Sequence, residues 1–145
     1  MPTSRCTFLA AIAGGSMATG KDVPILVVDD SQAVRLNVRS FLRSMGFSDI
    51  DLAEDGLVAL QKLRARGYGL VISDWVMDKV DGYELLKTVR DDAKLKHTPF
   101  IMITANNEPQ KVMLAKQAGV SNYIMKPFTI AVLKQKLEAV LGRLD

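Results

Sequence analysis

The chain has 145 residues, of which 48% are hydrophobic and 24% are charged, so it suits one globular domain with a substantial core. The net charge of +3 is too small and too dispersed to indicate nucleic-acid binding, and no apolar stretch reaches the roughly 18 residues that span a membrane. The single Cys6 and the single His97 exclude an internal disulfide and a zinc site built from histidine and cysteine, and the lone cysteine fits a reducing, cytoplasmic compartment.

The first twenty residues differ from the rest of the chain. Arg5 precedes a short apolar stretch and several small residues, a pattern that resembles a weak secretory signal. We favour a disordered leader or a misassigned start, with Met17 as the natural first residue, because a domain of the kind predicted below has no use for export. We therefore treat residues 1–20 as a leader and residues 21–145 as one domain.

From Pro24 onward, short apolar runs alternate with amphipathic stretches, which predicts five strand–helix pairs. In the first helix, apolar residues recur on one face from Val34 to Met45, and Gly46 follows as a residue that ends helices. In chain order, the expected strands are residues 25–28, 50–53, 70–74, 100–104 and 123–125, and the expected helices run from about 34 to 45, 56 to 66, 82 to 90, 109 to 118 and 129 to 144.

The strands that lead to Asp29, Asp74 and Thr104 are almost wholly apolar rather than alternating. Such strands are buried on both faces, which indicates a parallel sheet covered by helices. Right-handed crossovers leave few topologies. We expect an α/β fold with a doubly wound five-stranded parallel sheet of order 2-1-3-4-5 and helices on both faces, the known flavodoxin-like arrangement.

Polar residues stand where four of these strands end: Asp29 and Asp30, Asp74, Thr104 and Lys126. Because parallel strands present their carboxyl ends at one edge of the sheet, three carboxylates, a hydroxyl and an ammonium should meet there. Adjacent carboxylates repel one another, and Mg²⁺, which prefers oxygen ligands, would relieve that repulsion. The simpler alternative is that Asp30 only caps the first helix while Asp29 is solvated, but the other strand ends argue against it.

The glycines are isolated turn residues and form no phosphate-binding loop, so we do not expect a phosphoryl group to be held as part of a nucleotide. Aspartate can instead be a nucleophile that forms an acyl phosphate, and Asp74 on the central strand is the candidate. Mg²⁺ and Lys126 would offset charge on the phosphoryl oxygens, and Thr104 would donate a hydrogen bond to one of them.

Six short segments contain these residues and their neighbours: Val27–Ser31, Ala53–Gly56, Ile72–Trp75, Asp81-Gly82, Thr104-Ala105 and Lys126–Phe128. With them, residues 23–145 resemble the receiver domain of two-component response regulators. Four further features are Gly67–Gly69, Trp75, Glu84–Thr88 and Tyr123. With these, the chain looks closest to the single-domain chemotaxis regulators.

The resemblance implies a role for each matching residue. Asp74 would be the phosphoacceptor, and Lys126, joined to Pro127 by a cis peptide bond, would contact the phosphoryl group. Thr104 would move toward that group and Tyr123 would turn inward behind it, although Tyr123 can equally be an ordinary half-buried strand aromatic. Mg²⁺ would be bound by Asp29, Asp30, Asp74 and the backbone carbonyl of Val76.

The resemblance also implies a signalling switch rather than a turnover enzyme, with self-phosphorylation from small donors and slow self-dephosphorylation. The protein would be a cytoplasmic monomer that receives its phosphoryl group from a histidine kinase or a phosphotransfer domain. Its target would be a flagellar motor switch protein, or, in another phosphorelay, a kinase. The output surface would be formed by about residues 105–136, the last two strands and helices.

Three positions depart from the family pattern. Asp78 stands where proline is usual, and we interpret it as a solvated loop charge. Val76 stands where the chemotaxis regulators commonly have asparagine, and Asn106 stands where they have an acid. In the family, these two positions flank the path of the attacking water. An apolar Val76 predicts slow self-dephosphorylation, and both changes cast doubt on recognition by the usual chemotaxis phosphatase.

Three other classes of protein remain open. An aspartate-dependent phosphohydrolase uses a similar nucleophile but typically needs a second aspartate two residues later, where this chain has Val76. A flavin or nucleotide binder is disfavoured by the missing phosphate loop. A phosphorylation-independent interaction module is disfavoured by the complete acceptor set.

Overall fold

The computed structural model of the protein describes residues 22–105 and 109–142. Its five parallel strands form one open sheet of order β2-β1-β3-β4-β5, so the predicted fold class and strand order are confirmed. The predicted leader, Asn106 and Leu144 lie outside the described residues. The strands are β1 (Ile25–Val28), β2 (Ile50–Ala53), β3 (Leu70–Asp74), β4 (Phe100–Thr104) and β5 (Asn122–Met125).

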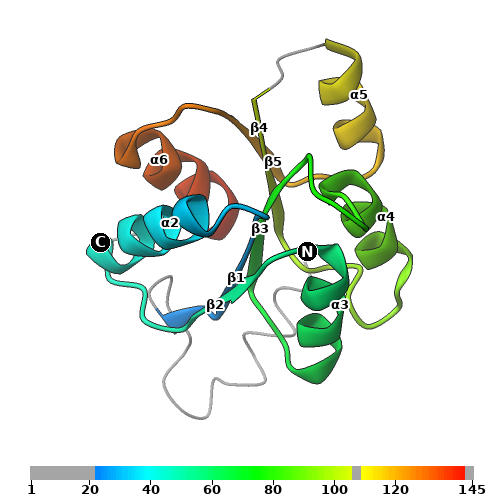
Figure 1. The fold of residues 1–145 in the computed structure, drawn as a ribbon, viewed down its shortest axis with the longest axis horizontal. Coiled ribbons are helices and arrows are strands. Elements are labelled where there is room, and N and C mark those ends of the chain that lie inside the picture. Colours follow the sequence, from blue (N-terminus) through cyan, green and yellow to red (C-terminus); the bar gives the residue numbers. More distant parts are fainter. Residues whose placement is uncertain (1–21, 106–108, 143–145) are drawn as a thin grey trace.

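The helices alternate with the strands and cover both faces of the sheet. Figure 1 shows α2 and α6 on one face and α3, α4 and α5 on the other. Within the described ranges, no helix is long and apolar enough to cross a membrane. The helices are α2 (Gln32–Ser44), α3 (Gly56–Ala65), α4 (Gly82–Asp91), α5 (Pro109–Gln117) and α6 (Ile130–Leu141).

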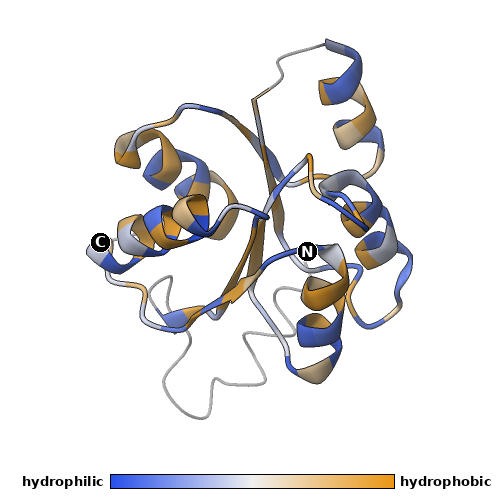
Figure 2. Cartoon of the chain, viewed as in Figure 1, coloured by the Kyte–Doolittle hydropathy of each residue, from blue (hydrophilic) through white to orange (hydrophobic). Residues whose placement is uncertain are grey.

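The three central strands are buried along their whole length, which explains why their sequences are continuously apolar. Successive side chains alternate between the two faces, so Leu26 joins the core beneath α3, α4 and α5 while Ile25 joins the core beneath α2 and α6. Figure 2 shows largely hydrophobic central strands between helices on which hydrophilic and hydrophobic residues alternate. The apolar face predicted from Val34 to Met45 packs on the second of these cores.

The strand register brings the polar strand ends together at one edge of the sheet. Val28 pairs with Ser73, so Asp29 emerges beside Asp74. Thr104 pairs with Met125, so Lys126 emerges next to Thr104. In the sheet, β1 lies on one side of β3, and β4 and β5 lie on the other. Asp29 and Asp30 therefore approach Asp74 from one side, and Thr104 and Lys126 approach it from the other.

Candidate functional site

Three carboxylates gather at the carboxyl ends of β1 and β3. Oxygen atoms of Asp29, Asp30 and Asp74 all lie within 4.8 Å of one another. Asp29 and Asp74 are only 3% and 8% exposed, whereas Asp30 faces solvent. The predicted convergence of these side chains is therefore present, with two buried acids and one exposed acid at the mouth of the site.

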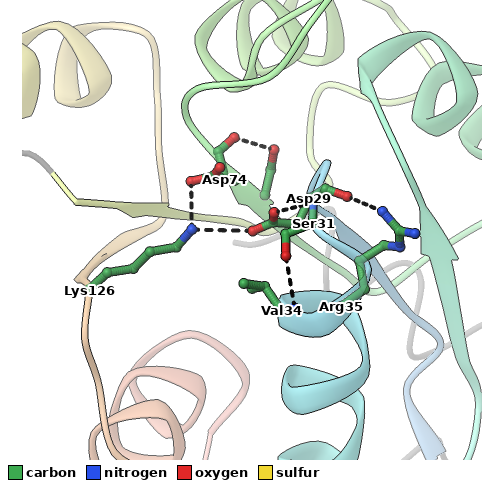
Figure 3. Close-up of polar contacts among 7 residues, drawn as sticks. Asp29, Ser31, Val34, Arg35, Asp74 and Lys126 are labelled. Carbon is green, nitrogen blue, oxygen red and sulfur yellow. Dashed lines mark hydrogen bonds and ion pairs between the residues drawn. The ribbon is translucent and has the colours of Figure 1, made fainter.

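The ammonium group of Lys126 lies between the two buried carboxylates, as Figure 3 shows. Its Nζ is 3.2 Å from Oδ1 of Asp74 and 3.3 Å from Oδ2 of Asp29. The peptide bond to Pro127 is cis, as the family resemblance predicted. A pocket of about 430 Å³ opens beside this lysine and is lined by Val34, Asn37, Ala105, Lys126, Pro127 and Phe128.

The charges of this cluster do not balance, because Lys126 pairs with two of its three carboxylates. Burial and the neighbouring charge of Asp29 raise the pKa of Asp74, against the opposing effects of Lys126 and the Trp75 backbone N–H. Burial tends to lower the pKa of Lys126, but Asp74 and Asp29 together hold it above its ordinary value. The excess of negative charge and the close-set carboxylate oxygens fit a hard divalent cation such as Mg²⁺.

The turn between β1 and α2 fixes the position of Asp29. The backbone N–H of Ser31 donates to Oδ1 of Asp29 at 2.9 Å, and Oγ of Ser31 accepts from the N–H of Val34 at 3.3 Å. Ser31 is thus the N-cap of α2, so the alternative role of Asp30 as the cap is wrong. The sequence analysis did not identify Arg35, whose Nη1 donates to the carbonyl of Asp29 at 2.6 Å. Its position one turn after Ser31, at the start of the first helix, is the feature of the sequence that could have indicated this contact.

A close approach between α4 and the end of β3 holds Asp74 from the other side. A Cβ atom on Gly82 would lie 2.1 Å from the carbonyl oxygen of Asp74, so only glycine fits there. The N–H of Gly82 donates to the carbonyl of Trp75 at 2.8 Å, and the carboxylate of Asp81 caps the helix by accepting from the N–H of Glu84 at 2.9 Å. The Asp81-Gly82 pair singled out in the sequence therefore begins α4 directly against the phosphoacceptor candidate.

An aromatic stack lies next to Asp74 and was not foreseen from the sequence. The rings of Trp75 and Tyr83 are parallel within 4°, with centroids 5.4 Å apart. The ammonium of Lys111 on α5 lies 5.4 Å from the centre of the Trp75 ring, and that of Lys87 lies 4.5 Å from the centre of the Tyr83 ring. Trp75 directly follows Asp74 in the chain and is buried, so its fluorescence should report on events at Asp74.

The remaining predicted residues occupy different depths. Thr104 is 1% exposed at the end of β4, and Tyr123 is half-buried and packs against the core beneath α3, α4 and α5. Val76, two residues after Asp74, is 60% exposed. Asp78 is exposed as well, which agrees with its interpretation as a solvated loop charge.

Comparison with known proteins gives the same family throughout. Residues 25–138 match the model of the response regulator receiver domain. The chain is 44% identical over 124 residues to the chemotaxis protein CheY-3 of Vibrio cholerae, covering 86% of this chain and 95% of that protein. It is 40% identical over 121 residues to the chemotaxis protein CheY of Pseudomonas aeruginosa, covering 83% of this chain and 98% of that protein.

Solved structures show the same fold. The chemotaxis protein CheY4 of Vibrio cholerae has a TM-score of 0.78 and 33% sequence identity, with 83% of this chain and 99% of that chain covered. A receiver domain of a sensor histidine kinase from Pseudomonas aeruginosa, which has a magnesium ion coordinated in its active-site cleft, has a TM-score of 0.76 and 28% identity over 84% of this chain and 99% of that chain. With its buried acids at the carboxyl edge of a five-stranded parallel sheet, this chain belongs to the response regulator receiver family.

Proposed function

We propose that this protein is a single-domain response regulator whose Asp74 accepts a phosphoryl group in the presence of Mg²⁺. The observation that carries this proposal is the grouping of three carboxylates within 4.8 Å, two of them bridged by Lys126. Asp29, Asp30, Asp74 and the carbonyl of Val76 are the proposed ligands of Mg²⁺. The bound ion supplies positive charge that offsets the charge on the phosphoryl oxygens.

The positions of the buried side chains support the following chemistry. A carboxylate oxygen of Asp74 attacks phosphorus, the bond from phosphorus to the donor breaks, and the leaving group departs with its electron pair. Lys126, already 3.2 Å from Oδ1 of Asp74, stabilises the charge on the transferred group. The hydroxyl of Thr104 donates a hydrogen bond to a phosphoryl oxygen of the product.

The phosphoryl group adds a charge of about −1.5 to −2 beside the ends of β3 and β4. We propose that Thr104 and Tyr123 transmit this change as the switch residues, one by moving toward the phosphoryl group and the other by turning inward. The phosphoryl group shifts the population only as far as it interacts differently with the two states. The surface that changes is formed by residues 105–136.

Receiver domains of this family are signalling switches that work with a histidine kinase and a downstream target. We propose chemotaxis as the process here, with a kinase of the chemotaxis type as donor and a flagellar motor switch protein as target, because the relatives are named as chemotaxis proteins. The protein would act as a cytoplasmic monomer. The alternative is a stand-alone receiver that takes its phosphoryl group from a phosphotransfer domain or acts on a kinase.

The position of Trp75 allows a direct test. Its fluorescence is recorded while Mg²⁺ and then acetyl phosphate are added to the wild-type protein and to Asp74→Asn. We expect a response to Mg²⁺, and a further donor-dependent change that is lost in Asp74→Asn. A folded protein that responds to neither would refute the proposal, and steady release of phosphate from added phosphomonoesters would favour the phosphohydrolase.

A further inference from the structure

The loop between β3 and α4, residues 75–81, carries the proposed carbonyl ligand of Val76. Its first half is anchored in the core, because Trp75 and Met77 on either side of Val76 are 6% and 7% exposed. Its second half has no such anchor at Asp78 and Lys79, which are both exposed. Lys79 has a φ of 64°, a backbone conformation that residues with side chains rarely adopt. A loop keeps such a conformation only when surrounding contacts restrain it.

The N-terminal end of α3 supplies that restraint. A Cβ atom on Gly56 would lie 2.5 Å from the carbonyl oxygen of Val80, so the absence of a side chain lets the loop pack directly on the helix. Beside this contact, Nζ of Lys79 lies 3.7 Å from Oδ2 of Asp55. Two adjacent loop residues, Lys79 and Val80, thus meet the N-cap and the first residue of α3.

Asp55 is a rigid partner for the loop lysine. It is 7% exposed, and its Oδ1 accepts the N–H of Val58 at 2.9 Å as the N-cap of α3. One carboxylate oxygen is therefore fixed by the helix while the other faces Lys79. An ion pair with a fixed carboxylate restrains the lysine side chain more than a pair between two mobile side chains would.

We propose that Asp55 and Lys79 are positioning residues for the metal site, which fasten the loop to α3 and so keep the carbonyl of Val76 beside Asp74. This inference rests on the proposed binding of Mg²⁺. Neither residue is among the three clustered carboxylates, so both act through the loop and not as ligands. The geometry assigns α3 a part in the affinity for the ion, although the helix contributes no ligand.

Charge alone predicts effects of opposite sign for the two residues, which makes the proposal testable. Loss of the positive charge of Lys79 near an acidic site would tighten Mg²⁺ binding, and loss of the negative charge of Asp55 would weaken it. If the two residues position the loop, both losses weaken binding. The double variant also restores the net charge of the wild type, so any remaining loss of affinity belongs to the loop.

The experiment measures the dissociation constant of Mg²⁺ by isothermal titration calorimetry for the wild type, Lys79→Gln, Asp55→Asn and the double variant. Asparagine is as good an N-cap as aspartate, so α3 keeps its start, and urea unfolding without Mg²⁺ checks the fold of each variant. Lys94→Gln, an exposed lysine in the loop that follows α4, is the matched control.

We expect each single variant to bind Mg²⁺ about two- to fivefold more weakly, and the double variant to bind no more weakly than the singles, because both remove the same contact. Tighter or unchanged binding by Lys79→Gln overturns the inference while leaving the proposed function intact. If the wild-type protein binds no Mg²⁺, the proposed function and this inference are both refuted.

Discussion

Replacing the proposed phosphoacceptor should make the protein more stable when Mg²⁺ is absent. The negative charge of Asp74 lies within 4.8 Å of two other carboxylates and 3.2 Å from one ammonium. At an effective dielectric constant of about 20, each repulsion is worth about 3.5 kcal/mol and the attraction about 5 kcal/mol, which leaves a net repulsion of roughly 2 kcal/mol. Solvent screens part of the repulsion from the exposed Asp30, but the burial of Asp74 also disfavours its charge, so we expect Asp74→Asn to raise the free energy of unfolding by at most about 2 kcal/mol.

Mg²⁺ should reverse this order of stability. At a concentration about 100 times its dissociation constant, the ion stabilises the wild type by about 2.7 kcal/mol, while a variant that lacks one carboxylate gains much less. The assay is urea unfolding of both proteins in EDTA and in saturating Mg²⁺. Asp91→Asn, which removes an exposed charge at the end of α4, should change the stability by less than about 0.5 kcal/mol in either condition. If Asp74→Asn is less stable than the wild type in EDTA, the attraction between Asp74 and Lys126 outweighs the repulsion among the carboxylates, which refutes the expected net repulsion.

Three further substitutions test other parts of the structure. Val76→Asn should shorten the half-life of the phosphorylated protein, because a polar side chain at this exposed position would help a water molecule to attack the phosphoryl group. The half-life is measured by loss of radiolabel, and an unchanged half-life would count against a role of Val76 in slowing dephosphorylation. Gly82→Ala should lower the free energy of unfolding by about 2–3 kcal/mol, because the added Cβ would lie 2.1 Å from the carbonyl oxygen of Asp74. Gly67→Ala is the control and should change the free energy of unfolding little, because a Cβ there meets nothing within 4 Å. Equal midpoints of urea unfolding for the two variants would contradict the packing argument. Arg90→Lys should lower the free energy of unfolding by about 1–3 kcal/mol in the same assay, because the guanidinium donates to three backbone carbonyls that a single ammonium cannot reach together. A loss below about 0.5 kcal/mol would show that water replaces these hydrogen bonds.

The sequence alone predicts the parallel sheet and the grouping of Asp29, Asp30, Asp74 and Lys126 at its carboxyl edge. Continuous apolar runs are the mark of strands buried on both faces, and such strands have their carboxyl ends at one edge. The polar residues that end those runs are therefore expected to lie at the same edge of the sheet. The strand order follows only from the known flavodoxin-like arrangement, because the pattern of residues does not distinguish between neighbouring positions in a sheet.

Only the tertiary structure decided how the site is held together. The bond from Arg35 to the carbonyl of Asp29, the contact of Gly82 with Asp74 and the stacking of Tyr83 on Trp75 all depend on how helices pack against strand ends. The periodicity of a sequence shows which face of a helix is apolar, but the distance of that helix from a particular backbone carbonyl depends on the packing of the whole core. The sequence thus determines which types of residue meet at this site, whereas the tertiary structure determines the distances between them.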